Sequence, residues 1–161
     1  IFLYTGSLKI NNYHKNRPDP NFWNCLTYNV IQKFFKDKNI CIHLCGANYD
    51  EDLTSLVADK LSDFNINFNK YIDKDFHFVC SILKHCDLSL IHSSGFIMLA
   101  DIFKTPCISM YFYRFGRNNE KFPYTGIVSP KAYYEKRMLP IMYYEHISNI
   151  NRKLSWINLK K

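Results

Sequence analysis

Near the middle of the chain, residues 81–106 read SILKHCDLSLIHSSGFIMLADIFKTP. This pattern predicts the end of a helix, a buried strand over residues 88–91, a tight turn at 93–95 and a short helix over 96–104. The apolar strand is too short and too continuous to have one wet face, which is typical of a parallel sheet. Where a strand passes into a helix, unpaired N–H groups and the positive end of the helix dipole can hold an anion. The stretch therefore predicts an anion-binding turn made by Ser93, Ser94 and Gly95.

Strands and helices alternate along the rest of the chain, outward from this stretch. Strands are expected at residues 1–4, 40–44, 65–71, 88–91 and 106–112, with one more short strand at 126–130. Helices are expected at 20–36, 50–62, 74–85, 96–104 and 143–159, with Asp19 and Asp73 as N-caps of the first and third. This alternation predicts an α/β fold, a Rossmann-like three-layer sandwich with a mostly parallel sheet. Residues 1–161 are expected to form a single domain.

The expected ligand site lies at one edge of this sheet. In open parallel sheets, ligands bind outside the carboxyl ends of the strands, near the point where the strand order reverses. Turns that follow three of the strands, at Gly6, Gly46 and Ser93 to Gly95, would all meet there. The polar loop after the first strand would add hydroxyl groups and positive charge. The predicted phosphate-binding residues are Gly6, Ser7, Lys9, Lys15, Arg17, Gly46, Ser93, Ser94 and Gly95. The alternatives are a helix cap at the serines, tight turns at the glycines and a solvated loop for the cations.

Composition narrows the range of partners and locations. The chain has 161 residues, a formal net charge of +7, 47% hydrophobic and 17% aromatic residues, which indicates a packed globular domain rather than disorder. The charge favours anionic partners and leaves peripheral contact with a membrane surface open. No stretch is long and apolar enough for a transmembrane segment, and no nucleic-acid recognition module is visible, so no specific nucleic-acid partner is expected.

Six cysteines favour a reducing compartment over a disulfide framework. Cys41, Cys45 and Cys107 fall within apolar strands, where a thiol acts as a small hydrophobe. We therefore expect a cytoplasmic protein, with the inner face of a membrane left open. Cys41, His43 and Cys45 would share one face of a strand, as zinc ligands can. No fourth ligand is spaced nearby, so core packing is favoured and no metal or other cofactor is expected.

The central stretch also resembles a known family. Residues Cys86-Asp87, 88–91, Ser94-Gly95, Leu99-Ala100 and Thr105-Pro106 resemble the donor-binding half of GT-B glycosyltransferases, especially the heptosyltransferase-like glycosyltransferase family nine. The chain departs from that family's pattern, with Ser93 in place of an acidic residue and Met98 in place of a histidine. The glycine that usually ends the family's last core strand is also replaced, near Phe112. Fucosyltransferase-like GT-B enzymes have a similar strand and serine-rich turn. They normally carry an arginine after the first strand, which Tyr4-Thr5-Gly6-Ser7 lacks.

The resemblance implies a carboxyl-terminal GT-B half that binds a nucleotide sugar without a metal. The implied enzyme is a glycosyltransferase that transfers a hexosyl or heptosyl group to a glycan, lipid or protein acceptor. Its catalytic base would lie on an amino-terminal acceptor domain or a partner chain, because no residue here is identified as the base. Since the chain begins at Ile1, we expect a fragment of a longer two-domain protein. The alternative is a catalytically degenerate GT-B-like domain that acts as a structural or interaction module in a larger assembly.

Overall fold

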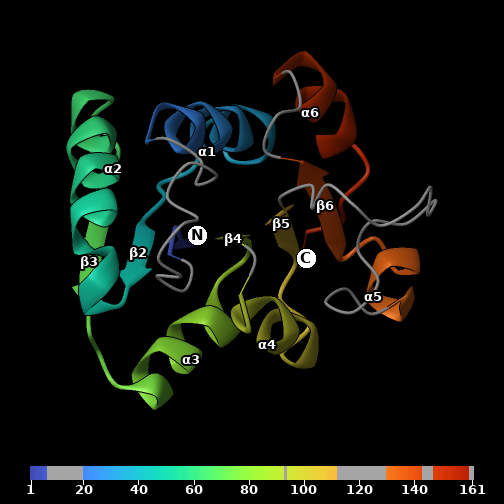
Figure 1. The fold of residues 1–161 in the computed structure, drawn as a ribbon. Coiled ribbons are helices and arrows are strands. Elements are labelled where there is room, and N and C mark those ends of the chain that lie inside the picture. The colour runs from blue at the N-terminus through green and yellow to red at the C-terminus, as the bar shows by residue number, and fades with distance from the viewer. Residues whose placement is uncertain (7–19, 93, 112–129, 143–146, 160–161) are drawn as a thin grey trace, which may run out of the picture.

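A six-stranded sheet forms the centre of the molecule. The computed structural model describes residues 1–6, 20–92, 94–111, 130–142 and 147–159. The strand order is β3-β2-β1-β4-β5-β6, and every neighbouring pair is parallel (Figure 1). The strands are β1 (Phe2–Tyr4), β2 (Ile42–Gly46), β3 (Phe68–Ile72), β4 (Ser89–His92), β5 (Cys107–Tyr111) and β6 (Met138–Met142). The predicted α/β class and parallel sheet are therefore confirmed.

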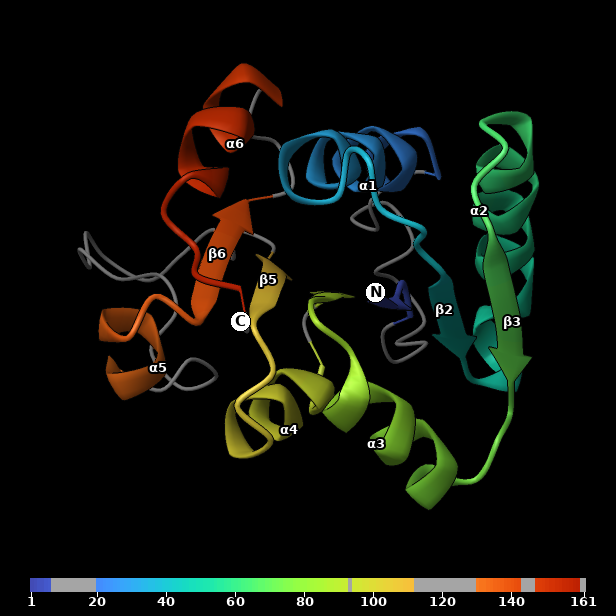
Figure 2. The ribbon, with the colours of Figure 1, turned by 180° about the vertical axis from the view of Figure 1, so that it is seen from behind.

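Helices cover both faces of the sheet, which makes three layers. One face carries α1 (Pro20–Phe34), α2 (Glu51–Asp63) and α6 (Ile147–Leu154). The other carries α3 (Phe76–His85), α4 (Phe96–Ile102) and α5 (Pro130–Tyr134). Figure 2 shows α1 and α6 together on one side of the strands and α3 and α4 together on the other. The arrangement is the Rossmann-like sandwich that the alternating pattern predicted.

Successive side chains of a strand point to opposite faces of the sheet, so they pack into two separate hydrophobic cores. In β1, Leu3 packs toward α1 and α2 with Trp23 and Leu44, whereas Phe2 and Tyr4 pack toward α3 and α4. The central strands are buried on both faces, as expected for a parallel sheet between two helical layers. All four residues of β4 are buried. Leu90 and Ile91 enter opposite cores, which explains why two apolar residues stand next to each other in this strand.

Two details of the predicted elements are wrong. The N-cap of α3 is Asp75 rather than Asp73, and its carboxylate accepts a hydrogen bond from the Phe78 N–H at 2.9 Å. Asp73 instead adopts a left-handed conformation, with φ of 53°. Residues 138–142, expected to lead into the last helix, form the edge strand β6, which pairs with β5. The expected strand at 126–130 falls mostly outside the described residues, and its last residue, Pro130, begins α5.

Candidate functional site

The strand order reverses between β1 and β4, at the centre of the sheet. Tyr4 is level with Ile91 of β4 on one side and with Cys45 of β2 on the other. From β1 the chain passes to α1 on one face, and from β4 it passes to α4 on the opposite face (Figure 1). Divergent connections of this kind leave a crevice at the carboxyl ends of the two strands. The edge at which we predicted a ligand therefore coincides with the reversal of strand order.

Ser94 and Gly95 form the turn between β4 and α4 at this edge. Their carbonyl groups accept hydrogen bonds from the N–H groups of Ile97 and Met98, at 3.2 and 3.1 Å. In the described part of the chain, the N–H groups of Gly95 and Phe96 donate to no backbone carbonyl. A side chain at Gly95 would meet no atom within 4 Å, so the outer side of the turn is open. The buried Ser94 hydroxyl makes no hydrogen bond to any residue that the structure describes.

Aromatic packing holds the start of α4 against β1. The Phe96 ring lies 4.8 Å from that of Tyr4 and 5.8 Å from that of Phe2, centroid to centroid, with tilted planes. Such pairs stabilise by about 0.5–1.5 kcal/mol beyond the area that they bury. Because Ser94 and Gly95 directly precede Phe96, the turn is attached to the sheet through buried rings. The position of the turn is therefore set in part by packing against β1.

The space beside Gly6 is occupied by the carboxylate of Asp50. A methyl group on Gly6 would overlap that carboxylate. Asp50 belongs to the short 3-10 turn η2 (Asn48–Asp50) that follows β2, and it is 1% exposed. Its Oδ2 accepts a long hydrogen bond, 3.4 Å, from the N–H of Ala47. The missing side chain at Gly6 thus admits Asp50 to the end of β1.

Gly46 is also closely packed by the protein itself. A side chain there would meet the Thr54 hydroxyl at 2.8 Å and the Ile72 side chain at 3.2 Å. The Thr54 hydroxyl in turn lies 3.4 Å from the hydroxyl of Thr5, and both threonines are fully buried. The close contact brings the first turns of α2 against the ends of β1 and β2. Of the three predicted turns, only the one at Ser94 and Gly95 has open space in front of it.

A buried acidic centre lies where β1 and β2 end. Burial raises the pKa of the Tyr4 phenol well above its ordinary value, and the nearby Asp50 carboxylate raises it further. Sequence reasoning missed Asp50 as a site residue, because it was expected only as the first residue of the helix at 50–62. Its position after the second strand of a βαβ unit was an available signal, because an acidic residue near there faces ribose hydroxyls in dinucleotide-binding folds. The crevice therefore has an acidic end at β1 and β2 and an end rich in N–H groups at β4.

Five further predicted site residues are not among those that the structure describes. Ser7, Lys9, Lys15, Arg17 and Ser93 lie outside the described residues, so their part in the site stays a prediction. Among the neighbours of the turn, His92 is 1% exposed and lies in the sheet interior rather than facing solvent. This burial favours a core role for His92.

Of the three residues considered as zinc ligands, His43 and Cys45 lie on one face of β2, and Cys41 comes directly before that strand. Cys45 is buried, and burial raises the pKa of its thiol to about 12. The His43 ring stacks on Tyr71 at 6.0 Å, and its pKa is lowered chiefly by burial. The Cys41 sulfur accepts a hydrogen bond from the Asn69 amide at 3.2 Å. Within the described ranges, no three His, Cys, Asp or Glu side chains are grouped so that they could hold a metal ion.

Comparisons with protein-family models, with curated proteins and with solved structures find no match to this chain. The structure therefore defines the protein by its fold alone. It is a Rossmann-like α/β domain with an open turn where the strand order reverses. Of the helices in the described segments, none has the length and apolar character needed to cross a bilayer.

Proposed function

We propose that this chain is the nucleotide-sugar-binding half of a GT-B glycosyltransferase. The observation that carries the proposal is the open turn at Ser94 and Gly95, which lies at the reversal of strand order and has N–H groups unused by the backbone. A diphosphate needs such donors, because backbone N–H groups at a strand-to-helix turn match its oxygens without a metal. The resemblance of residues 83–106 to donor-binding GT-B domains supports the same ligand.

The two ends of the crevice would hold different parts of the donor. A diphosphate is repelled by the buried Asp50 carboxylate and is better placed at the β4 end, beside Ser94 and Gly95. The acidic end, with Asp50 and the Tyr4 hydroxyl, suits the hydroxyl groups of a ribose, which can donate to a carboxylate. This arrangement places the nucleoside over β1 and β2 and the sugar toward α4.

The domain's contribution to transfer would be stabilisation of the leaving group. The acceptor oxygen attacks the anomeric carbon, the bond from that carbon to the diphosphate oxygen breaks, and a base takes the acceptor's proton. The N–H groups at the β4 turn would stabilise the negative charge that develops on the departing nucleoside diphosphate. The base would come from an acceptor half, in the same protein or in a partner chain.

Calorimetric titration with ADP-, UDP- and GDP-sugars tests the proposal. At least one donor should bind, and Gly95→Val should weaken it by about tenfold or more, because the new side chain fills the open turn. Since nothing lies within 4 Å of that position, the variant should fold normally. Ile102→Ala, at the exposed far end of α4, is the matched control and should bind like the parent. If no nucleotide binds, or if Gly95→Val binds normally, the proposal is wrong.

A second candidate is an interaction module with the same fold. This candidate is favoured by exposed apolar side chains on α3 and α4. Phe76, Met98 and Ile102 are 58%, 56% and 69% exposed. Exposed apolar side chains that gather on neighbouring helices can mark a surface for a partner, which here suits an acceptor half docked on α4. The double variant Met98→Glu, Ile102→Glu separates the candidates. It should leave nucleotide affinity unchanged if the chain binds donors by itself, and it should abolish association with the acceptor half if the chain is an interaction module.

A further inference from the structure

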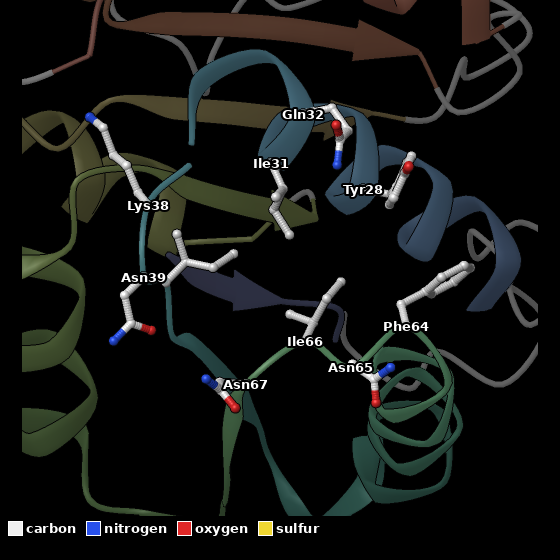
Figure 3. A pocket seen from close by; sticks show the side chains of 10 residues that line it. Tyr28, Ile31, Gln32, Lys38, Asn39, Phe64, Asn65, Ile66 and Asn67 are labelled. Carbon is white, nitrogen blue, oxygen red and sulfur yellow. The ribbon is translucent and has the colours of Figure 1, made fainter. Parts of the chain in front are cut away.

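A second concave site lies at the opposite edge of the sheet, far from the crevice. It is a pocket of about 280 Å³ between the second half of α1, the segment that enters β2 and the segment that enters β3. Residues 38–40 and 64–67 precede these two strands, so the pocket sits at their amino ends. In Figure 3, Ile31 and Ile66 point toward one another across its middle. The nucleotide proposal makes no use of this pocket.

One wall is formed by two exposed aromatic rings. Tyr28 of α1 is 44% exposed and Phe64 at the end of α2 is 52% exposed, and their ring centroids are 5.8 Å apart at 36° (Figure 3). A planar base inserted between two rings needs a separation of about 7 Å, twice the carbon–carbon contact distance. The pair is therefore too close to hold a base between its rings. It instead offers ring faces to a ligand that carries aliphatic C–H groups.

The rim is built from uncharged amides. Gln32, Asn39, Asn65 and Asn67 line the pocket, and none of the four side chains makes a hydrogen bond in the described part of the chain. Each amide both donates and accepts, as does a sugar hydroxyl. Among the described residues that line the pocket none is acidic and one, Lys38, is a cation, whose ammonium lies 5.8 Å from the centre of the Phe35 ring. The lining thus matches a neutral ligand rather than a cation or a multiply charged anion.

Helix termination fixes part of this rim in place. After α2, the Ile66 N–H donates to the Leu61 carbonyl at 3.1 Å and the Asn65 N–H donates to the Ser62 carbonyl at 2.9 Å. With Asn65 left-handed at φ of 54°, this is the Schellman arrangement, which ties the residues after a helix to its last turn. The Asn67 carbonyl accepts from the Ile42 N–H at 2.9 Å. The amides of Asn65 and Asn67 therefore extend from backbone that is already ordered.

We infer that this pocket binds a neutral saccharide, with one sugar ring stacked on Tyr28 and Phe64 and its hydroxyls bonded to the four amides. The volume is at the small end of ligand pockets, which suits a single ring, such as the end of a glycan chain. The inference is independent of the nucleotide proposal, because the two sites lie at opposite edges of the sheet.

Nuclear magnetic resonance titration of the whole chain tests the inference, with the methyl glycosides of glucose, galactose, mannose and N-acetylglucosamine as probes. At least one should shift the side-chain amide signals of Gln32, Asn39, Asn65 and Asn67. Tyr28→Ala should weaken that binding by about tenfold, which corresponds to loss of one aromatic contact. The matched control is Tyr134→Ala, which removes an exposed tyrosine from α5 and should bind normally.

A second variant keeps the test independent of the aromatic wall. Asn39→Asp keeps the size of the side chain but removes its donor, so it should weaken a neutral sugar. The inference is overturned if no glycoside shifts the four amides, if Tyr28→Ala binds normally, or if adenosine or a short uncharged peptide shifts them where the glycosides do not. Shifts confined to Ser94 and Gly95 would also overturn it and would point to the crevice instead.

Discussion

At the scale of single residues, the carboxyl edge depends on one close contact, between Gly6 and Asp50. The sequence placed the turn at Ser94 and Gly95 correctly, because the strand, the turn and the helix are contiguous. It could not reveal that Asp50 fills the space at Gly6, because that contact requires β1 and β2 to be neighbours. Local pattern thus predicts which segments turn, whereas strand order decides which of these turns stay open.

Gly6→Ala should lower the free energy of unfolding by about 1–3 kcal/mol, the usual cost of overpacking. The added methyl group must displace the buried Asp50 carboxylate. Urea denaturation measures the change, and Gly95→Ala is the control, expected within about 0.5 kcal/mol of the parent. In an Asp50→Ser background, which leaves room for the methyl group, the cost of Gly6→Ala should shrink. An equal cost in both backgrounds would contradict the contact.

Because the Cys107 thiol is buried, we expect the free energy of unfolding to fall at alkaline pH. Burial raises the pKa of Cys107 from 9.0 to about 12 in the folded protein. Between these values the unfolded thiol loses its proton while the folded thiol keeps it, so the unfolded state binds fewer protons and stability falls as pH rises. In denaturant melts from pH 8 to about pH 10.5, Cys107→Ala should show a shallower decline than the parent. Cys25→Ala, which removes an exposed cysteine, should follow the parent, and three parallel curves would rule the explanation out.

At the scale of elements, helical periodicity predicted α1, α2, α3 and α4 within a few residues, because each has one apolar face or a clear cap. The edge strand β6 was missed because it contains Pro140, which cannot donate to a ladder and reads as a strand breaker. An edge strand tolerates proline on its outer side, and Pro140 stands level with Ser109 of β5. The helix α5, five residues long, carries too little periodic pattern to be recognised.

The observed start of α3 yields a prediction about its cap. Asp75→Ala should cost about 1 kcal/mol, because the Phe78 N–H would lose its acceptor at the end of the helix. Asp75→Asn should retain most of the stability, since an asparagine side chain also caps. Asp73→Asn is the control for the neighbouring position, and it should have little effect because asparagine also tolerates the left-handed backbone. Thermal melts would decide between the two aspartates, and a larger effect at Asp73 would contradict the observed cap.

At the scale of the whole molecule, β1 is the one strand of the described sheet that pairs with both groups of strands. It pairs with β2 on one side and with β4 on the other, whereas β2 and β4 do not pair with each other. The sequence predicted parallel strands and layered helices but not this order, because a crossover helix does not specify which neighbour its strand joins. The three residues of β1 therefore connect the β2–β3 pair to the β4–β5–β6 group.

Leu3→Ala should accordingly destabilise the entire domain by about 2–5 kcal/mol. Leu3 is fully buried and lies level with Leu44 and Leu90 of the two neighbouring strands. Tryptophan fluorescence, which reports on Trp23 and Trp156 in the core that also contains Leu3, and far-ultraviolet circular dichroism should show one coincident transition at a lower denaturant concentration. Two separated transitions would mean that the two groups of strands unfold independently.

The central position of β1 also bears on how the domain resists force. A strand clamped by parallel neighbours on both sides cannot peel away bond by bond when tension is applied along it, because both ladders must shear together. An unfolding motor that approaches from the side of β1 must break both ladders of this clamp together. One that approaches from the side of α6 next reaches β6, which in the described sheet pairs with β5 alone. The force needed to unfold the domain should therefore depend on the direction of pulling. It should be higher when the chain is pulled from the side of β1 than from the side of β6.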